Sequence, residues 1–196
     1  MARASLRNDI LAAGLRVMFR RGYNGAGIRD IAADAAAPHG SFTNHFRSKE
    51  AFATEVLDRY FDDVKRMLGD ALGDERLSCP QRLRRYLDVV TERLEADAFT
   101  RGCLIGDFSI ETAQASEMLR NRLLEIYREW RDLFADCIAA GQVAGEIGTA
   151  FTPGDLADFL IASWEGAILC MKVERTPAPL ERFKRIAFAT IFTTGS

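Results

Sequence analysis

The segment 27–50 constrains the fold more than any other part of the sequence, because it has room for two helices of only about two turns each. Ile28, Ile31 and Ala35 recur at the spacing of one apolar helix face. Pro38 has no N–H group and disfavours the helical conformation of the residue before it, so the first helix is predicted to end near residue 36. Two short helices joined by such a turn indicate a helix-turn-helix.

The second helix of this segment is predicted to begin at Pro38, with Phe42 and Phe46 on its inward face. A helix this short is not stable alone in water, so neighbouring helices must hold it. Its outer face carries small or hydrogen-bonding residues. In a helix-turn-helix that face enters the major groove, so we expect residues 38–46 to contact DNA.

The residue types on this face suit different DNA contacts. Asn44 can form a bidentate pair with adenine, and Ser41 and Thr43 can contact a base edge or a thymine methyl group. Gly40 allows close approach of the backbone, while His45 and Lys49 suit phosphates. The predicted DNA-contacting residues are Arg29, His39, Gly40, Ser41, Thr43, Asn44, His45 and Lys49.

The charge distribution supports this assignment, although the whole chain has a net charge of −2. Residues 1–50 contain eight basic and four acidic groups, a net charge of +4, and the remainder has −6. A basic segment on an acidic body is expected where one small domain meets phosphate. The same asymmetry leaves an alternative open, a helical scaffold whose basic end binds RNA or an acidic protein.

The rest of the sequence has helical periodicity and no convincing strand pattern. We predict an all-α protein of about nine helices that forms a dimer. A three-helix helix-turn-helix domain spans residues 5–65, with the DNA-reading motif at about 28–47, and a ligand-binding and dimerisation bundle spans residues 66–196. The predicted helices are 5–21, 28–36, 38–46, 49–68, 80–98, 103–113, 116–140, 153–176 and 180–192.

An ordered set of short segments over about forty residues resembles the N-terminal domain of the TetR family of bacterial repressors. Two positions depart from the usual family pattern, since Ala36 stands where the turn commonly has Gly and Thr43 where the recognition helix commonly has a phosphate-contacting Tyr. A left-handed Ala costs about 1 kcal/mol, so we expect a slightly different turn and one phosphate contact fewer. The matching segments are 10–13, 19–23, 30–32, 40–42 and 45–50.

The C-terminal half has a narrower resemblance, to a TetR branch that includes repressors of electrophile and acrylate detoxification genes. The matching positions are 101–106, Gln142, 145–147, 164–167, Lys172 and 179–180. The resemblance implies that Cys103 and Lys172 sense reactive compounds. The break at Arg101-Gly102 puts Cys103 at a helix N-terminus, which favours the thiolate. The alternative is that Cys103 is a small inert core residue.

Several aromatic residues of the bundle are candidates for an apolar effector site, with plain core packing as the alternative. These candidates are Phe108, Tyr127, Trp130, Phe159, Trp164 and Met171. Together with Cys103 and Lys172, the members Phe108, Tyr127, Trp130 and Trp164 form the predicted ligand-binding set.

Other classes of protein find little support. Both histidines, His39 and His45, lie in the recognition helix, so the body lacks the histidines that a di-iron bundle or a Ser-His-Asp triad needs. We therefore predict no catalytic residues, no metal and no cofactor. The four cysteines lie at least 24 residues apart without a C-x-x-C pair, so we expect reduced thiols rather than a zinc site or a disulfide framework.

No apolar run approaches the roughly 18 residues that a membrane span needs, and the N-terminus lacks an apolar signal core. We expect a cytoplasmic protein without membrane contact. The hypothesis is a homodimeric transcriptional repressor that binds a near-palindromic operator in double-stranded DNA. The family resemblance implies that its last two helices pair with those of a second copy, and that a small effector, with an electrophile as one candidate, shifts the fourth helix and releases DNA.

Overall fold

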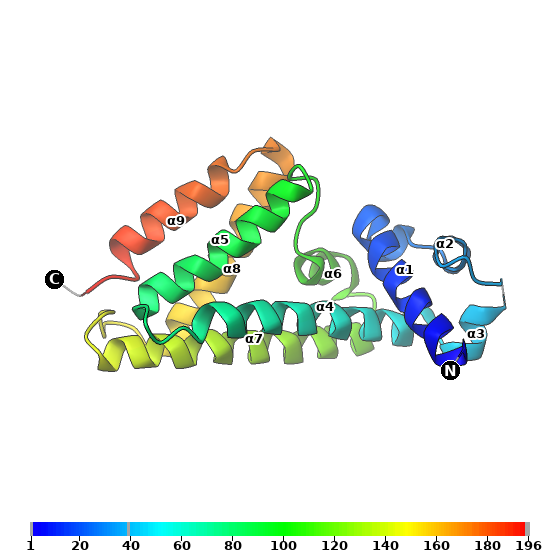
Figure 1. The fold of residues 1–196 in the computed structure, drawn as a ribbon, viewed down its shortest axis with the longest axis horizontal. Coiled ribbons are helices and arrows are strands. Elements are labelled where there is room, and N and C mark those ends of the chain that lie inside the picture. The colour runs from blue at the N-terminus through cyan, green and yellow to red at the C-terminus, as the bar shows by residue number, and fades with distance from the viewer. Residues whose placement is uncertain (1, 39, 195–196) are drawn as a thin grey trace. The chain divides into compact units, whose positions relative to one another are not determined.

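The computed structural model describes residues 2–38 and 40–194, and this part of the chain contains nine α-helices and no strand (Figure 1). The all-α prediction is therefore confirmed. In chain order the helices are α1 (Ala2–Gly25), α2 (Ile28–Asp34), α3 (Ser41–His45), α4 (Lys49–Leu72), α5 (Cys79–Ala96), α6 (Leu104–Thr112), α7 (Glu117–Val143), α8 (Pro153–Glu174) and α9 (Ala178–Thr190).

The chain forms two compact units. The first comprises Met1–Asp63 and Cys103–Glu125, and the second comprises Val64–Gly102 and Ile126–Ser196. Helices α4 and α7 each begin in the first unit and continue into the second. The functional boundary predicted between residues 65 and 66 stays a prediction, because compact packing units need not coincide with functional domains.

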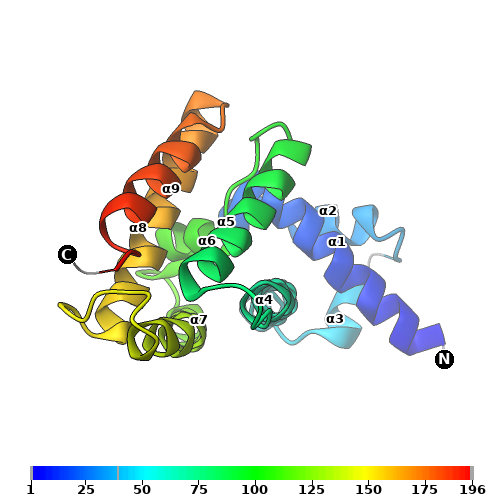
Figure 2. The same ribbon diagram turned by 60° about the vertical axis from the view of Figure 1, so that its left-hand side comes forward.

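The first unit is built on α1, which packs against α2 and α6 (Figure 2). The short helix α3 is held by the aromatic cluster, which we define as Phe42, Phe46 and Phe52. The ring centroid of Phe52 lies 4.9 Å from that of Phe42 and 4.7 Å from that of Phe46. Phe42 and Phe46 are 1% and 4% exposed, which confirms their predicted inward placement. Burial of these rings supplies the stability that five helical residues cannot supply themselves.

Gly22 interrupts α1, as the sequence predicted. Its φ of 70° and ψ of 178° are not helical, although a final turn continues to Gly25. The carboxylate of Glu111, at the end of α6, lies against this break and accepts a hydrogen bond from the backbone N–H of Asn24 at 2.8 Å. A Cβ atom at position 22 would lie 2.1 Å from Glu111 Oε1, so the close approach requires glycine here.

The second unit contains the antiparallel pair α8 and α9, which lie side by side in both views, with α5 against α9 (Figures 1 and 2). Lys184 of α9 is 2% exposed, and its ammonium lies 2.6 Å from Asp88 and 2.7 Å from Glu181. It also contacts the hydroxyl of Thr91 at 3.3 Å. A buried ammonium is tolerated because these oxygens replace its lost water.

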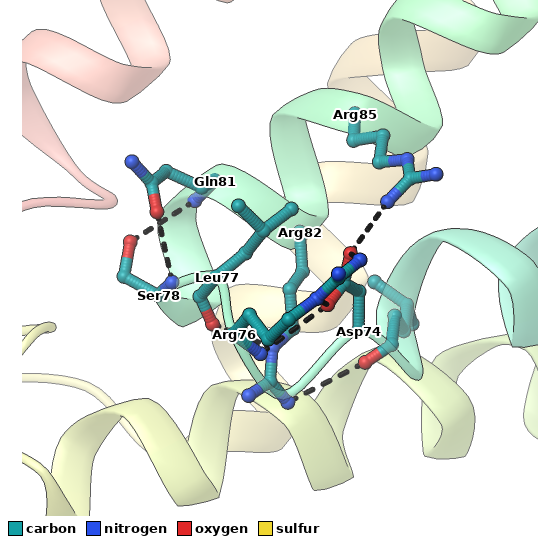
Figure 3. A network of polar contacts seen from close by, with 8 residues as sticks. Asp74, Arg76, Leu77, Ser78, Gln81, Arg82 and Arg85 are labelled. Carbon is teal, nitrogen blue, oxygen red and sulfur yellow. Dashed lines mark hydrogen bonds and ion pairs between the residues drawn. The ribbon is translucent and has the colours of Figure 1, made fainter.

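Several helix ends differ from those predicted. α5 begins at Cys79, because Ser78 and Gln81 form a capping box in which each side chain bonds the other's backbone N–H (Figure 3). Asp74 strengthens the preceding loop by pairing with Arg76 at 2.8 Å and with Arg85 at 3.0 Å. The Arg76 guanidinium lowers the pKa of the Asp74 carboxyl well below its usual range.

Helix α3 begins at Ser41 and not at Pro38, because the Ser41 N–H closes a turn onto the Pro38 carbonyl at 2.8 Å. Two glycines that were predicted to weaken or end helices lie inside them instead. α4 continues through Gly69 to Leu72, and α7 continues through Gly141 to Val143. Among the described residues, no helix is both long enough and apolar enough to cross a membrane.

Candidate nucleic-acid interface

Only some of the predicted DNA-contacting residues are exposed in the helix-turn-helix. Thr43 and Asn44 are exposed on α3, as are Gly40 before it and Arg29 on α2. His45 and Lys49 are half-buried. His39 lies outside the described residues.

Two hydroxyl residues of α3 are engaged within the protein. Ser41 is only 8% exposed, which does not favour the predicted base contact. The Thr43 hydroxyl donates a hydrogen bond to the Gly40 carbonyl at 3.0 Å. Asn44 is therefore the residue of α3 that best combines exposure with a two-sided amide suited to a base edge.

Lys49 is held at the start of α4 by an aromatic ring. Its ammonium lies 4.5 Å from the ring centroid of Tyr23, a cation–π contact. Burial lowers the pKa of Lys49, with the negative charge of Glu111 acting in the opposite direction. Burial likewise raises the pKa of Tyr23, and the charge of Glu50 adds to that effect. A phosphate approaching Lys49 would therefore meet an ammonium already fixed in place.

The turn between α2 and α3 is closed by a left-handed alanine. Ala36 has φ 49°, so the expectation of a different turn at this position is wrong. The N–H of Ala36 bonds the Ala33 carbonyl at 3.0 Å and the N–H of Ala37 bonds the Ala32 carbonyl at 2.9 Å. These two bonds form a Schellman motif, which satisfies the last carbonyls of α2 and outweighs the left-handed cost.

Several of the basic residues that the structure describes in segment 1–50 form ion pairs inside the first unit. Asp34 accepts from Arg16 at 2.9 Å and from Arg20 at 2.7 Å, which ties α2 to α1. The hydrogen bond from Arg20 is the main reason that the pKa of Asp34 is lowered. The other pairs are Arg21 with Asp30 and Arg7 with Glu55. The positive charge predicted for this segment therefore serves internal packing as well as its surface.

The candidate effector residues divide between the two units. Cys103 and Phe108 belong to the first unit, and Tyr127, Trp130, Trp164 and Lys172 belong to the second. Cys103 is the N-cap of α6 and is 7% exposed, and its sulfur accepts a hydrogen bond from the Tyr60 hydroxyl at 3.7 Å. Phe108 is fully buried and meets the Tyr23 ring edge to face at 5.6 Å.

In the second unit, Trp130 is 3% exposed and Trp164 2% exposed. Tyr127 stacks on Trp130 with ring centroids 6.3 Å apart. The buried indole N–H of Trp130 has no hydrogen-bond partner within the part of the chain that the structure describes. The Lys172 ammonium lies 3.6 Å from the point that a Cβ atom on Gly102 would occupy. The other two cavity candidates differ, since Met171 is fully buried while Phe159 is 40% exposed.

Sequence reasoning missed Glu111, Tyr60 and Tyr23, which connect α6 to α1 and α4. Glu111 and Asn24 are 87 residues apart, and no local pattern signals a contact over that separation. The glycine at position 22 gave only a partial signal, because it follows the predicted helix 5–21 as a helix stop and does not by itself indicate a contact with another element.

Comparison with known proteins assigns these features to one family. Residues 10–56 match the family described as bacterial regulatory proteins, tetR family, and residues 79–187 match the tetracyclin repressor-like C-terminal domain. The chain belongs to the TetR family. As a TetR-family member it is a DNA-binding transcriptional repressor and not an enzyme, which replaces the alternative of an RNA-binding or protein-binding scaffold.

The TetR assignment extends over nearly the whole chain. The HTH-type transcriptional repressor DhaR of Mycobacterium sp. (strain GP1) is 42% identical over 191 residues, which cover 97% of this chain and 94% of that protein. The transcriptional regulator AcuR of Cereibacter sphaeroides is 32% identical over 192 residues, covering 97% and 87%. A crystal structure of regulatory protein TetR from Rhodobacter sphaeroides superposes with a TM-score of 0.89 at 30% identity, covering 94% and 97%.

Proposed function

We propose that this repressor acts as a homodimer that binds a near-palindromic operator and releases it when a small effector binds. The observation that carries the proposal is the exposed Asn44 on a short helix that the aromatic cluster holds rigidly. Two such helices in a two-fold dimer would address two half-sites whose centres lie about 34 to 36 Å apart, or a little more.

The first unit offers a physical link between the effector side and the DNA side. Helix α6 begins at Cys103, which bonds Tyr60 of α4, and ends near Glu111, which holds the backbone of α1 at Asn24. A change at Cys103 would therefore disturb α4 directly and reach α1 through α6. Such a shift would alter the placement of the recognition helix, which is how we propose that DNA is released.

The proposed effector has two chemical features. The unpartnered indole N–H of Trp130 favours a ligand with a hydrogen-bond acceptor, such as a carbonyl oxygen, because an acceptor would satisfy that buried donor. The thiol of Cys103 favours an electrophile. The Lys172 ammonium lies 3.6 Å from the point that a Cβ atom would occupy on Gly102, the residue before Cys103 in the sequence. Within the second unit, Tyr127 and Trp164 would supply apolar surface.

The DNA-binding roles are tested with Asn44→Ala and Lys49→Ala, using DNA from upstream of the repressor's own gene and a scrambled duplex. We expect Asn44→Ala to weaken binding to the operator by about 1 to 3 kcal/mol and to leave binding to the scrambled duplex unchanged. Lys49→Ala should weaken binding to both duplexes alike and flatten the salt dependence, because a phosphate contact releases a counterion. Equal salt slopes and equal specificity ratios for the two variants would contradict these roles.

The effector proposal is tested by measuring operator release on addition of N-ethylmaleimide, a thiol-reactive compound. The native protein, Cys103→Ser, Lys172→Ala and Cys170→Ser are compared, the last as a control because Cys170 is an exposed cysteine. We expect release from the native and Cys170→Ser proteins, none from Cys103→Ser and a slower response from Lys172→Ala. Undiminished release from Cys103→Ser would refute covalent sensing at Cys103.

A further inference from the structure

Two cysteines that are not among the effector candidates lie together inside the second unit. The sulfur atoms of Cys79 and Cys137 are 3.2 Å apart, with a hydrogen bond between the two thiols. Both side chains are buried, 3% and 9% exposed, and both thiols are free. A disulfide bond is about 2.05 Å long, so the sulfurs need to approach by only about 1.2 Å to become bonded.

The surroundings of Cys79 fix it at the first turn of α5. Its backbone N–H donates to the Glu146 carboxylate at 2.7 Å, and the capping box of Ser78 and Gln81 holds the residues on either side of it. Gly141 of α7 lies one helical turn after Cys137, and a Cβ atom there would come within 2.7 Å of the Cys79 Cβ. The absence of a side chain at Gly141 is therefore what allows the two helices to bring these sulfurs together.

The electrostatic surroundings favour ionisation of one thiol of the pair. The hydrogen bond with Cys79 lowers the pKa of Cys137 and the positive charge of Arg82 acts in the same direction, while burial and the charge of Glu146 oppose them in part. The pKa of Cys79 is raised, first by its bond to Cys137 and then by burial, because a second negative charge beside the first is unfavourable. One thiolate beside one thiol is the state in which a dithiol reacts with an oxidant.

We propose that Cys79 and Cys137 form a reversible intramolecular disulfide when the repressor meets a peroxide. The Cys137 thiolate attacks one peroxide oxygen, the O–O bond breaks, and the departing oxygen takes a proton to leave as water or an alcohol. The Cys79 sulfur then attacks the sulfur of the sulfenic acid, the S–O bond breaks, and the hydroxyl leaves as water with the proton of the Cys79 thiol. Two thiols lose two electrons and two protons in total, and the peroxide gains them. This reaction goes beyond the proposed function, because it does not involve Cys103.

The test uses the full-length protein with Cys103→Ser and Cys170→Ser, which leaves only the proposed pair. The reduced protein is treated with hydrogen peroxide, unfolded, labelled with N-ethylmaleimide and weighed by mass spectrometry. Before oxidation we expect two labels. After oxidation we expect none, with a mass lower by two hydrogens and one tryptic species joining residues 77–82 to residues 132–172. Treatment with dithiothreitol should restore both labels.

The matched variants separate a specific pair from general oxidation. Adding Cys79→Ser removes the second thiol, so Cys137 should stop at the sulfenic acid and react with dimedone. The native protein with all four cysteines should lose two of its four labels, at the same two positions. Retention of both labels, conversion of Cys137 to sulfinic acid without the cross-link, or a cross-link between two chains would overturn the proposal. Operator release in the Cys103→Ser variant is measured separately, so failure here is distinct from failure of the effector proposal.

Discussion

Ala36 has a left-handed backbone conformation, which residues with a Cβ atom rarely adopt. Its φ of 49° lies in the left-handed region, which costs a residue with a Cβ atom about 1 kcal/mol. The two hydrogen bonds of the Schellman motif hold it there. The side chain is exposed, so removing it sacrifices little packing.

We predict that Ala36→Gly stabilises the protein by about 1 kcal/mol, because glycine adopts this conformation without strain. Thermal or urea unfolding measures the change. The control is Ala33→Gly, the same replacement at an exposed helical position of α2, which should destabilise the protein by a similar amount. Destabilisation by both variants would show that position 36 is not left-handed in solution.

Asp34 makes a contribution to the free energy of unfolding that depends on pH. Its bonds to Arg16 and Arg20 lower its folded pKa, so its contribution to stability is fully present above the unfolded pKa of about 3.9. That contribution is lost as the pH falls through the folded pKa. We predict that Asp34→Asn lowers the free energy of unfolding at pH 7 by at most about 1 kcal/mol, and that the difference from the native protein shrinks as the pH falls through the folded pKa.

Unfolding curves from pH 2 to pH 7 measure this difference. The control is the same replacement in a background that carries Arg16→Gln and Arg20→Gln, where the loss at pH 7 should be absent. A loss of equal size in both backgrounds would mean that Asp34 stabilises the protein through something other than these two arginines.

The sequence predicted residues well where one local pattern decided their environment. Phe42 and Phe46 are inward because their four-residue spacing allows one buried face. The buried Lys184 and the burial of Ser41 could not be predicted in the same way, because both depend on helices distant in sequence or on the exact start of a helix. The contact between Cys79 and Cys137 also escaped prediction, since 58 residues separate them and no local sequence pattern signals a contact over that separation.

At the scale of elements, α6 meets the break in α1 through a contact that requires one particular residue type, glycine at position 22. Gly22 combines a positive φ with an extended ψ, a region that essentially only glycine occupies, and it also lies against Glu111. Gly145 has a similar φ of 72°, but no atom lies within 4 Å of the position that its Cβ would take. A side chain at position 22 would therefore have to displace Glu111, whereas a side chain at position 145 would displace no neighbouring atom.

We predict that Gly22→Ala destabilises the protein by about 2 to 4 kcal/mol, because strain adds to displacement of the Glu111 carboxylate. Gly145→Ala should cost only about 1 kcal/mol, from backbone strain alone. Denaturant unfolding of the two variants, together with Gly22→Ala/Glu111→Ala, measures the contact. Similar losses for both single variants, or no partial recovery in the double variant, would contradict a close contact between Gly22 and Glu111.

Helix existence was easier to predict than helix ends. The start of α8 was predicted correctly because Thr152, Pro153 and Asp155 form a strong local signal, and Thr152 does accept the Asp155 N–H at 3.1 Å. The predicted ends at Gly69 and Gly141 were wrong, because tertiary packing outweighs the roughly 1 kcal/mol helix penalty of a single glycine. Packing of that kind is not visible in a local window of sequence.

At the scale of the whole molecule, α8 and α9 carry large apolar side chains that are exposed to solvent. Four large apolar side chains on these helices are 40% to 83% exposed: Phe159, Leu169, Val173 and Ile186. Exposed apolar side chains of this size are a common feature of interaction surfaces when they lie together. A second copy of the chain would cover it.

We predict that sedimentation at micromolar concentration gives a species of twice 21.8 kDa. Ile186→Asp should shift the protein toward the monomer, because a charge would be buried in the interface. Val143→Asp, which replaces a 91% exposed residue on α7, is the control and should leave the dimer intact. A native protein that sediments as a monomer would exclude this mode of assembly.

The hydrogen bond between Glu111 and Asn24 has a consequence for how such a repressor can diverge. The carboxylate binds a backbone N–H, which every amino acid except proline provides, so residue 24 can change freely while the junction persists. Gly22 has no such freedom. Related repressors could therefore change much of the DNA-binding surface to suit a new operator and still keep the contact between α6 and α1. That contact needs only the glycine at position 22 and the glutamate at position 111.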